Sequence, residues 1–310
     1  MRGLLKYKLE KYMVEVIELG YVGLNVTDME AWRSYATECI GLEIAESDKD
    51  DRFYLRMDKQ HHRFTIFKSD QDDLAYMGWR VKGQEEFKAM QQQLTDAGVA
   101  FRVGTEEEAR ERHVLALIKL DDPSGTPNEI YYSPQVDVMK PFHPGRPMHG
   151  KFVAGNQGLG HVLVRSDDDQ ATYDFYKLLG LKGSIEYRIA LPDGNCAEPV
   201  FMSCNDRQHS IAFGFHGMVE RLNHLHIQYT EFDDLGISHD TIRNQKIDVA
   251  MQLGKHANDQ LYTFYSPTPS GWLMELGWGD CVKPEAQEHY TGDIFGHAVE
   301  ASGYGMDIEL

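Results

Sequence analysis

The sequence has few cysteines, and their spacing is not that of a structural framework. Four cysteines are spread over the 310 residues without forming a Cys-x-x-Cys pair, and they are Cys39, Cys196, Cys204 and Cys281. This spacing argues against a disulfide-stabilised secreted fold and against a cysteine-rich zinc site. We therefore expect free thiols in a reducing compartment, and we take the cytoplasm as the default location.

Long apolar runs and an excess of basic charge are also missing. No apolar stretch approaches the roughly 18 to 20 residues that a membrane-spanning helix needs. Lys and Arg number 31 against 49 Asp and Glu, which gives a formal net charge of −18. Nucleic-acid phosphates and anionic membranes would repel such a chain, so a small molecule is the expected partner. The composition, with 42% hydrophobic and 26% charged residues, is that of a globular protein.

The first residues of the chain do not match a targeting segment. Residues 1–12 include basic side chains, but they have neither the apolar stretch nor the cleavage site of a secretory signal. The patterned sequence begins only after Met13. We therefore predict that residues 1–12 are an extension that the fold does not need.

An internal repeat organises the rest of the chain. Residues 18–42 and 158–181 share one pattern: Leu-Gly, an alternating strand, an Asp-containing turn, an amphipathic helix and a Gly-Leu end. A second match lies near the end of each half, where Glu129 and Glu275 each follow the glycine of a Pro-Ser-Gly turn by four residues. Such self-similarity indicates a duplicated domain.

The pattern within each half predicts strands and helices in a fixed order. Helices are expected at 28–38 and 84–97 in the first half and at 168–179 and 233–245 in the second, each followed by strand segments. We predict an α+β protein of two domains, each made of two βαβββ modules. The expected division is an N-terminal extension at 1–12, an N-terminal domain at 13–137, a Pro- and Gly-rich linker at 138–157, a C-terminal domain at 158–281 and a tail at 282–310.

The repeat allows the two halves to be compared residue by residue. Three positions of interest pair as His161 with Tyr21, His224 with Tyr76, and Glu275 with Glu129. Two imidazoles and one carboxylate that converge from three strands form the 2-His-1-carboxylate triad, which leaves open positions on a divalent metal ion. A substrate and O2 can then bind the same ion. We predict a metal site in the second half and a structural, metal-free first half.

One of these ligands has an alternative. His226 follows His224 by two residues, and residues two apart on a strand point to the same face. Spacing alone therefore does not choose between the two histidines. The repeat favours His224, because it is the residue that pairs with Tyr76, and His226 would then lie further along the sheet, near the pocket.

Five longer segments carry a family resemblance. They are residues 19–36, 157–168, 204–213, 223–236 and 254–279. The last is the most specific, because it combines a His-x-Asn-Asp element, a Phe-Tyr pair and the pattern Pro-Ser-Gly-x-x-x-Glu. On these segments the chain resembles, over nearly its whole length, the two-domain type I extradiol catechol dioxygenases of the vicinal oxygen chelate superfamily.

The resemblance implies a reaction and a cofactor. Members of this family insert both atoms of O2 into a catechol ring beside its diol. This sequence looks like those that cleave 2,3-dihydroxybiphenyl and alkylcatechols in the degradation of aromatic compounds. The resemblance implies Fe(II) held by His161, His224 and Glu275, with Mn(II) as an alternative because it accepts the same ligands. Family members commonly have an apolar residue in place of His226, and they are commonly oligomeric, so we expect a homo-oligomer.

The resemblance also implies roles for residues outside the metal triad. They are the catalytic residues His209, His256 and Tyr265 and a supporting shell of Asn258, Asp259 and His226. His209 would act as the acid/base that takes a catechol proton and later returns it. His256 and Tyr265 would donate hydrogen bonds to developing oxyanions. The repeat adds nothing for His209, because His62 holds the equivalent place in the first half.

Two other functions compete with this one. A glyoxalase-type metal-dependent isomerase or lyase would share the fold, but such enzymes typically draw four protein ligands, and that function does not explain the His-x-Asn-Asp element. A non-catalytic protein that binds aromatic ligands would also share the fold, although it would not need an intact His/His/Glu set. No single residue of the sequence identifies the substituent on the catechol ring of the substrate.

Overall fold

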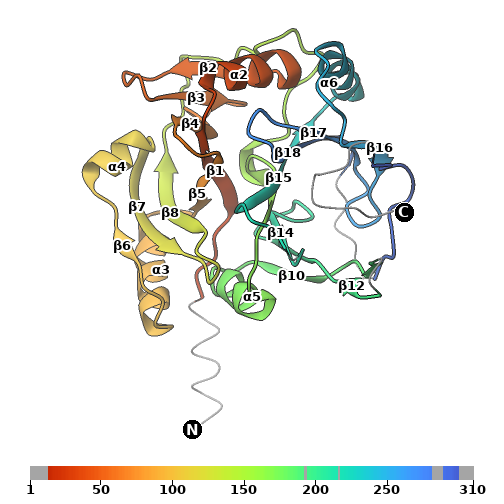
Figure 1. Ribbon diagram of the computed structural model, residues 1–310. Coiled ribbons are helices and arrows are strands. Elements are labelled where there is room, and N and C mark those ends of the chain that lie inside the picture. The colour runs from red at the N-terminus through yellow and green to blue at the C-terminus, as the bar shows by residue number, and fades with distance from the viewer. Residues whose placement is uncertain (1–12, 192–193, 216, 281–288, 300–310) are drawn as a thin grey trace.

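The computed structural model of this chain describes residues 13–191, 194–215, 217–280 and 289–299. These residues form two eight-stranded sheets, one from each half of the chain (Figure 1). The predicted extension at 1–12 lies outside the described residues, and so does the predicted tail at 282–310 apart from 289–299. The predicted domain boundaries stay a proposal, and we refer below to the N-terminal half and the C-terminal half.

The N-terminal sheet has the strand order β2-β3-β4-β1-β5-β8-β7-β6. Its strands are β1 (Glu18–Val26), β2 (Glu43–Glu46), β3 (Arg52–Arg56), β4 (Phe64–Lys68), β5 (Asp73–Arg80), β6 (Arg102–Val103), β7 (Val114–Asp121) and β8 (Pro127–Pro134). Its helices are α2 (Met29–Ser34), the π-helical turn η1 (Tyr35–Ile40), α3 (Gln84–Asp96) and α4 (Glu106–Glu111). The helix predicted at 28–38 is thus divided into α2 and η1.

The C-terminal sheet has the order β10-β13-β14-β9-β15-β18-β17-β16. Its strands are β9 (His161–Val164), β10 (Lys182–Ile185), β13 (Val200–Ser203), β14 (Ile211–Phe213), β15 (Leu222–Tyr229), β16 (Met251–Lys255), β17 (Tyr262–Pro267) and β18 (Leu273–Trp278). A short hairpin pairs β11 (Ile189–Ala190) with β12 (Cys196–Ala197). The helical elements are the 3-10 turn η2 (Gly155–Gln157), α5 (Asp169–Leu178) and α6 (Phe232–Asn244).

The two sheets have the same topology, which confirms the predicted pair of βαβββ modules in each half. In both, the first strand lies in the middle, parallel to the last strand of its own module and antiparallel to the first strand of the next. The helices follow these strands for local reasons. The Asp168 side chain, for example, accepts a hydrogen bond from the backbone N–H of Ala171 at 3.0 Å and so caps the start of α5.

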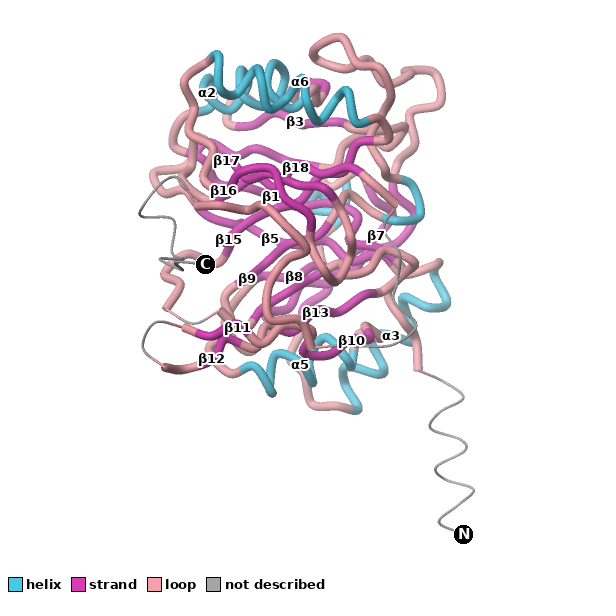
Figure 2. Tube along the Cα trace, turned by 90° about the vertical axis from the view of Figure 1, so that its right-hand side faces the viewer, coloured by secondary structure: helices cyan, strands magenta, loops and turns pink. Residues whose placement is uncertain are grey.

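Apolar side chains from both halves form one continuous core. The indole of Trp32, on α2, packs against that of Trp272 beside β18, with ring centroids 5.2 Å apart. The Tyr35 hydroxyl hydrogen-bonds the Ser266 hydroxyl of β17 at 2.7 Å. Figure 2 shows α2 and α6 at one end of the molecule, α3 and α5 at the other, and the strands between them. The N-terminal half therefore supports the strands that carry the candidate site.

The helices carry no membrane-spanning segment. Within the described ranges, every helix is too short or too polar to cross a bilayer.

Candidate active site

Three side chains of the C-terminal sheet converge on one point. His161 begins β9, His224 lies on β15 and Glu275 lies on β18. The imidazole nitrogens and the carboxylate oxygen of these residues all lie within 4.8 Å of one another. The Nε2 atom of His161 is 2.9 Å, and that of His224 is 3.6 Å, from Oε2 of Glu275. The pairing of β9, β15 and β18 produces this convergence, because it places the three residues on one face of adjacent strands.

The donor set is suited to a divalent metal ion. Oε2 of Glu275 is buried and has no hydrogen-bond partner among the residues that the structure describes, although His161 is close. Two ligand atoms at about 2.1 Å from one ion and at right angles to each other lie about 3 Å apart, which is near the observed spacing. Burial lowers the pKa of His224 to about 3, so its imidazole is neutral at pH 7 and has a lone pair to offer.

A cavity opens next to this triad. Its polar end is formed by His161, His209, His224, His256, Asn258, Asp259, Tyr265, Glu275 and Asp293. Its walls are mainly apolar and include Leu163, Ile189, Pro199, Phe201, Phe215, Met251, Leu273 and Val299. A flat aromatic molecule with polar atoms at one edge matches this distribution.

His209 is buried and stacks on the triad. Its ring centroid is 3.8 Å from that of His161, and the planes are tilted by 35°. Its Nδ1 atom contacts the side-chain oxygen of Gln208, whose amide nitrogen in turn donates to Glu186 at 2.6 Å. Because a carbonyl oxygen only accepts, Nδ1 of His209 carries the hydrogen and Nε2 carries the lone pair. Burial lowers the pKa of His209 well below its ordinary value, so the ring is a neutral proton acceptor.

His256 and Tyr265 approach the triad from the other side. The Nε2 atom of His256 lies 2.9 Å from the Tyr265 hydroxyl and 3.1 Å from Oε1 of Glu275. Burial would lower the pKa of His256, but its hydrogen bonds to Asp293 and Glu275 outweigh burial and raise it well above the ordinary value. Burial also raises the pKa of Tyr265 well above its ordinary value, so this hydroxyl remains a donor.

Asn258 and Asp259 brace the loop that carries His256 between β16 and β17. The Asn258 amide donates to Oε2 of Glu186 at 3.1 Å, and its oxygen accepts from the backbone N–H of Asp259 at 2.8 Å. The Asp259 carboxylate accepts from the backbone N–H of Leu261 at 2.9 Å. Both residues also line the cavity, as expected of a supporting shell.

His226 lies behind the triad and does not line the cavity. Its ring stacks on that of His161 with centroids 4.4 Å apart and planes within 10°. The side chain is fully buried, and within the described part of the chain neither ring nitrogen has a hydrogen-bond partner. His226 therefore packs against His161, and of the two histidines it is His224 whose ring nitrogen lies within 4.8 Å of the ligand atoms of His161 and Glu275.

The sequence analysis missed a group of residues that cluster next to His256. Asp293 lies 2.9 Å from Nδ1 of His256 and 2.6 Å from Nδ1 of His297. Tyr187, just before β11, hydrogen-bonds Asp293 at 3.0 Å. Residues 289–299 show no strand or helix period, and they follow the last segment of family resemblance. The one available clue was an Asp and a His four residues apart.

Two family models match the chain. The model described as dihydroxybiphenyl dioxygenase BphC D1 matches residues 19–68. The model of the glyoxalase/bleomycin resistance protein/dioxygenase superfamily matches residues 158–276, which include the whole triad.

Relatives of known activity match nearly the whole chain. The chain is 60% identical to biphenyl-2,3-diol 1,2-dioxygenase of Sphingomonas paucimobilis, across 96% of this chain and 100% of the relative. It is 58% identical, with the same coverage, to 1,2-dihydroxynaphthalene dioxygenase of Sphingobium xenophagum. An iron-dependent extradiol dioxygenase of Rhodococcus jostii is 34% identical across 92% of this chain and 97% of its own. A crystal structure of catechol 2,3-dioxygenase superimposes with a TM-score of 0.94 at 55% identity, across 96% of this chain and 99% of that one.

Proposed function

Because the chain belongs to the extradiol catechol dioxygenases of the vicinal oxygen chelate superfamily, we propose that its C-terminal half holds Fe(II) and opens catechols that have an apolar substituent. The observation that carries this proposal is the buried His161, His224 and Glu275 triad at the polar end of an aromatic-lined cavity. Both oxygen atoms of O2 enter the product, and the ring opens beside the diol.

Iron is the proposed ion. A relative at 34% identity is named as iron-dependent, and two neutral imidazoles with one carboxylate are suited to Fe(II). The same three ligands accept Mn(II), which remains the alternative ion. Held by His161, His224 and Glu275, such an ion would supply Lewis-acid and redox chemistry for a catechol and O2.

His209 is proposed to move protons. The unprotonated Nε2 atom of its buried ring accepts a proton from a catechol hydroxyl, and the Gln208 side chain holds the ring in the tautomer that makes this transfer available. The close contact of its ring with that of His161, 3.8 Å between centroids, supports a base beside the proposed metal site. The same nitrogen can return the proton at a later step.

His256 and Tyr265 are proposed to stabilise negative charge on the substrate oxygens. Both side chains line the cavity and are hydrogen-bonded to each other at 2.9 Å. Donors that are already fixed in a buried site need no reorganisation when charge develops, so they lower the barrier more than water would.

The cavity wall supports a substrate with a second ring. Phe201, Ile189, Phe215 and Leu273 offer apolar surface to the cavity, and little of this wall can hydrogen-bond. Two relatives at 58% identity or more are named for bicyclic diols, biphenyl-2,3-diol and 1,2-dihydroxynaphthalene. We therefore propose bicyclic catechols as preferred substrates over methylcatechols, because the second ring buries more apolar area.

Oxygen uptake with isotope labelling tests the proposed function. The protein is loaded anaerobically with Fe(II), mixed with 2,3-dihydroxybiphenyl, 1,2-dihydroxynaphthalene or 3-methylcatechol, and exposed to ¹⁸O2. We expect one O2 consumed per catechol, a coloured ring-opened product and two labelled oxygen atoms in it. Iron-loaded protein that consumes no O2 with any of the three diols would overturn the proposal in favour of the isomerase or the binding protein.

A further inference from the structure

Residues 289–299 contribute Thr291, Gly292, Asp293 and Val299 to the lining of the active-site cavity. On one side the backbone N–H of Arg188 donates to the carbonyl of Tyr290 at 2.7 Å. On the other, the N–H of Lys255, at the end of β16, donates to the carbonyl of Phe295 at 2.8 Å. Figure 1 shows this segment beside β16 at the edge of the C-terminal sheet. Both attachments fix the backbone on either side of Asp293, whose side chain lines the cavity.

The Asp293 carboxylate joins three side chains from different parts of the C-terminal half. Its Oδ1 atom is 2.9 Å from Nδ1 of His256 and 3.0 Å from the Tyr187 hydroxyl. Its Oδ2 atom is 2.6 Å from Nδ1 of the fully buried His297. The Thr263 hydroxyl connects the two imidazoles, because it contacts Nε2 of His297 at 3.0 Å and Nε2 of His256 at 3.2 Å.

We propose that Asp293 is a positioning residue that accepts the Nδ1 hydrogen of His256 and so fixes the orientation of its ring for ring cleavage. This inference rests on the proposed function and extends it to a segment outside both family-model matches. A carboxylate only accepts hydrogen bonds, so it holds the hydrogen of His256 on Nδ1 and turns Nε2 toward Tyr265 and Glu275. His297 and Tyr187 hold the carboxylate in the orientation that this requires.

The same cluster could instead hold a second metal ion, since one ligand atom from each of His256, Asp293 and His297 lies within 4.8 Å of the others. The hydrogen bonds favour positioning over metal binding. Both Nδ1 atoms donate to the carboxylate, one to each oxygen, so neither presents a lone pair to a shared ion. A second ion would have to displace both hydrogens.

The first measurement detects the hydrogen bond between Asp293 and His256 in protein that holds neither metal nor substrate. Metal-free protein with ¹⁵N-labelled histidine is compared with D293A and D293N by long-range ¹H–¹⁵N correlation, with H256N to assign the His256 signals. We expect Nδ1 of His256 to carry a hydrogen in the wild type, to lose it in D293A and to keep it in D293N, whose side-chain oxygen can still accept. An unchanged His256 spectrum in D293A would overturn the proposal.

The second measurement compares steady-state kinetics of the iron-loaded variants. We expect kcat of D293A to fall about 10- to 100-fold, the usual range for groups that orient functional histidines, with KM for the diol changed less than about threefold. D293N should recover most of kcat. The matched control is D240N, which removes a surface Asp–His pair on α6 whose atoms are 3.8 Å apart, and it should be indistinguishable from the wild type.

The outcomes separate this inference from the proposed function. Active wild-type enzyme with unchanged kcat in D293A would remove the role of Asp293 and leave the function intact. Inactive, iron-loaded wild type would remove the function, even with the Nδ1 hydrogen of His256 in place. Two metal ions per chain, one of them lost in D293A, would replace positioning with a second metal site.

Discussion

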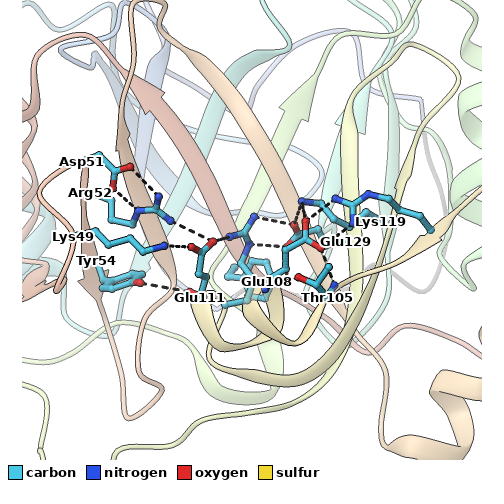
Figure 3. A network of polar contacts seen from close by, with 12 residues as sticks. Lys49, Asp51, Arg52, Tyr54, Thr105, Glu108, Glu111, Lys119 and Glu129 are labelled. Carbon is cyan, nitrogen blue, oxygen red and sulfur yellow. Dashed lines mark hydrogen bonds and ion pairs between the residues drawn. The ribbon is translucent and has the colours of Figure 1, made fainter.

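The two halves of this protein neutralise the same carboxylate in different ways. In the N-terminal half, Glu129 accepts from the Tyr21 hydroxyl at 2.8 Å and from the Arg112 guanidinium at 2.9 and 3.0 Å, and Lys119 lies 3.3 Å away. Figure 3 shows Glu129 within this network of acidic and basic side chains. In the C-terminal half, the equivalent Glu275 has no guanidinium or ammonium partner among the described ion pairs, and it lies 2.9 to 3.6 Å from the imidazoles of His161, His224 and His256. The first half neutralises its glutamate with cationic side chains of the chain itself, and we propose that the second half does so with a bound metal ion.

The strand register shows that these positions are equivalent. Tyr21 pairs with Gly78, which pairs with Glu129; likewise, His161 pairs with His226, which pairs with Glu275. The repeat in the sequence therefore corresponds to a repeat in space. It also shows that Tyr265 lies opposite Glu275 as Lys119 lies opposite Glu129, so a hydroxyl near the proposed metal replaces an ammonium group.

The two halves also differ in the aromatic ring that stacks on the side chain of their first strand. The position of His226 is Gly78 in the N-terminal half, where a Cβ atom would lie 2.2 Å from the Tyr21 ring. The position of Tyr131 is Gly277 in the C-terminal half, where a Cβ atom would lie 2.6 Å from Nε2 of His226. Each half thus stacks one aromatic ring on its first-strand ring, but the stacking ring comes from a different strand: Tyr131 lies on β8, two strands from β1, and His226 lies on β15, next to β9. The unusual His226 takes the space that Gly277 leaves.

Removal of a proposed metal ligand should have the largest effect on the difference in metal binding between the two halves. H224A takes away one of the two imidazoles of the proposed triad, and this type of site is built from three protein ligands. We expect the iron content to fall to background and activity to become undetectable. The matched control is Y76F at the equivalent position, where the hydroxyl has no hydrogen-bond partner in the described structure. Y76F should bind iron normally, and tight iron binding by H224A would contradict the assignment.

The second comparison separates two equivalent histidines. His209 and His62 both precede the strand that pairs in parallel with the first strand of their half. Only His209 lies beside a triad of metal-binding type, so we expect H209A to retain iron and to lose about 10²- to 10⁴-fold in kcat, the range for general acid–base groups. H62A should keep its turnover when assayed well below its unfolding temperature. Equal kcat values for H209A and wild type would remove the acid/base role.

The sequence predicted those parts of the fold and site that repeat. The succession of strands and helices along the chain, the module count and the pairing of His161 with Tyr21 follow from alternation and from the repeat, which can be read directly from the sequence. Asp293 could not be predicted in this way. It reaches His256 through a segment that has no regular period and is attached to β16 by only a few hydrogen bonds. The orientation of His209 also depends on Gln208, whose contacts are set by tertiary packing.

The third comparison concerns Arg112, the cationic side chain that neutralises Glu129 in the N-terminal half. Arg112 is 7% exposed and Glu129 is fully buried, so R112A leaves a buried carboxylate with Lys119 as its remaining basic partner. We expect the free energy of unfolding to fall by about 3 kcal/mol, near the low end for breaking a buried ion pair, without loss of iron from the C-terminal half. Urea unfolding and metal analysis measure the two effects.

A surface ion pair in the same half provides the control for R112A. Arg110 pairs with Glu106 at 3.6 Å, and both side chains are exposed, so R110A should cost less than about 1 kcal/mol. Equal destabilisation by R110A and R112A would show that burial of the Glu129 pair does not set its contribution.

The smallest expected effect is a change in acid stability. Burial lowers the pKa of His61 to about 4, and its Nδ1 atom lies 3.1 Å from that of His62, whereas the equivalent of His61 in the C-terminal half is Gln208. His61 in the unfolded chain titrates near 6.5. Between about pH 6.5 and pH 4 the unfolded chain therefore binds more protons than the folded one, and the free energy of unfolding decreases as the pH is lowered. H61Q removes this group and gives the N-terminal half the Gln–His pair of the other half. We expect H61Q to lose less stability than the wild type between pH 7 and pH 5 in urea unfolding, while H143Q, at an exposed position, should match the wild type. Equal losses for H61Q and wild type would assign the acid sensitivity of this half to other groups, with the buried His62 the first to examine.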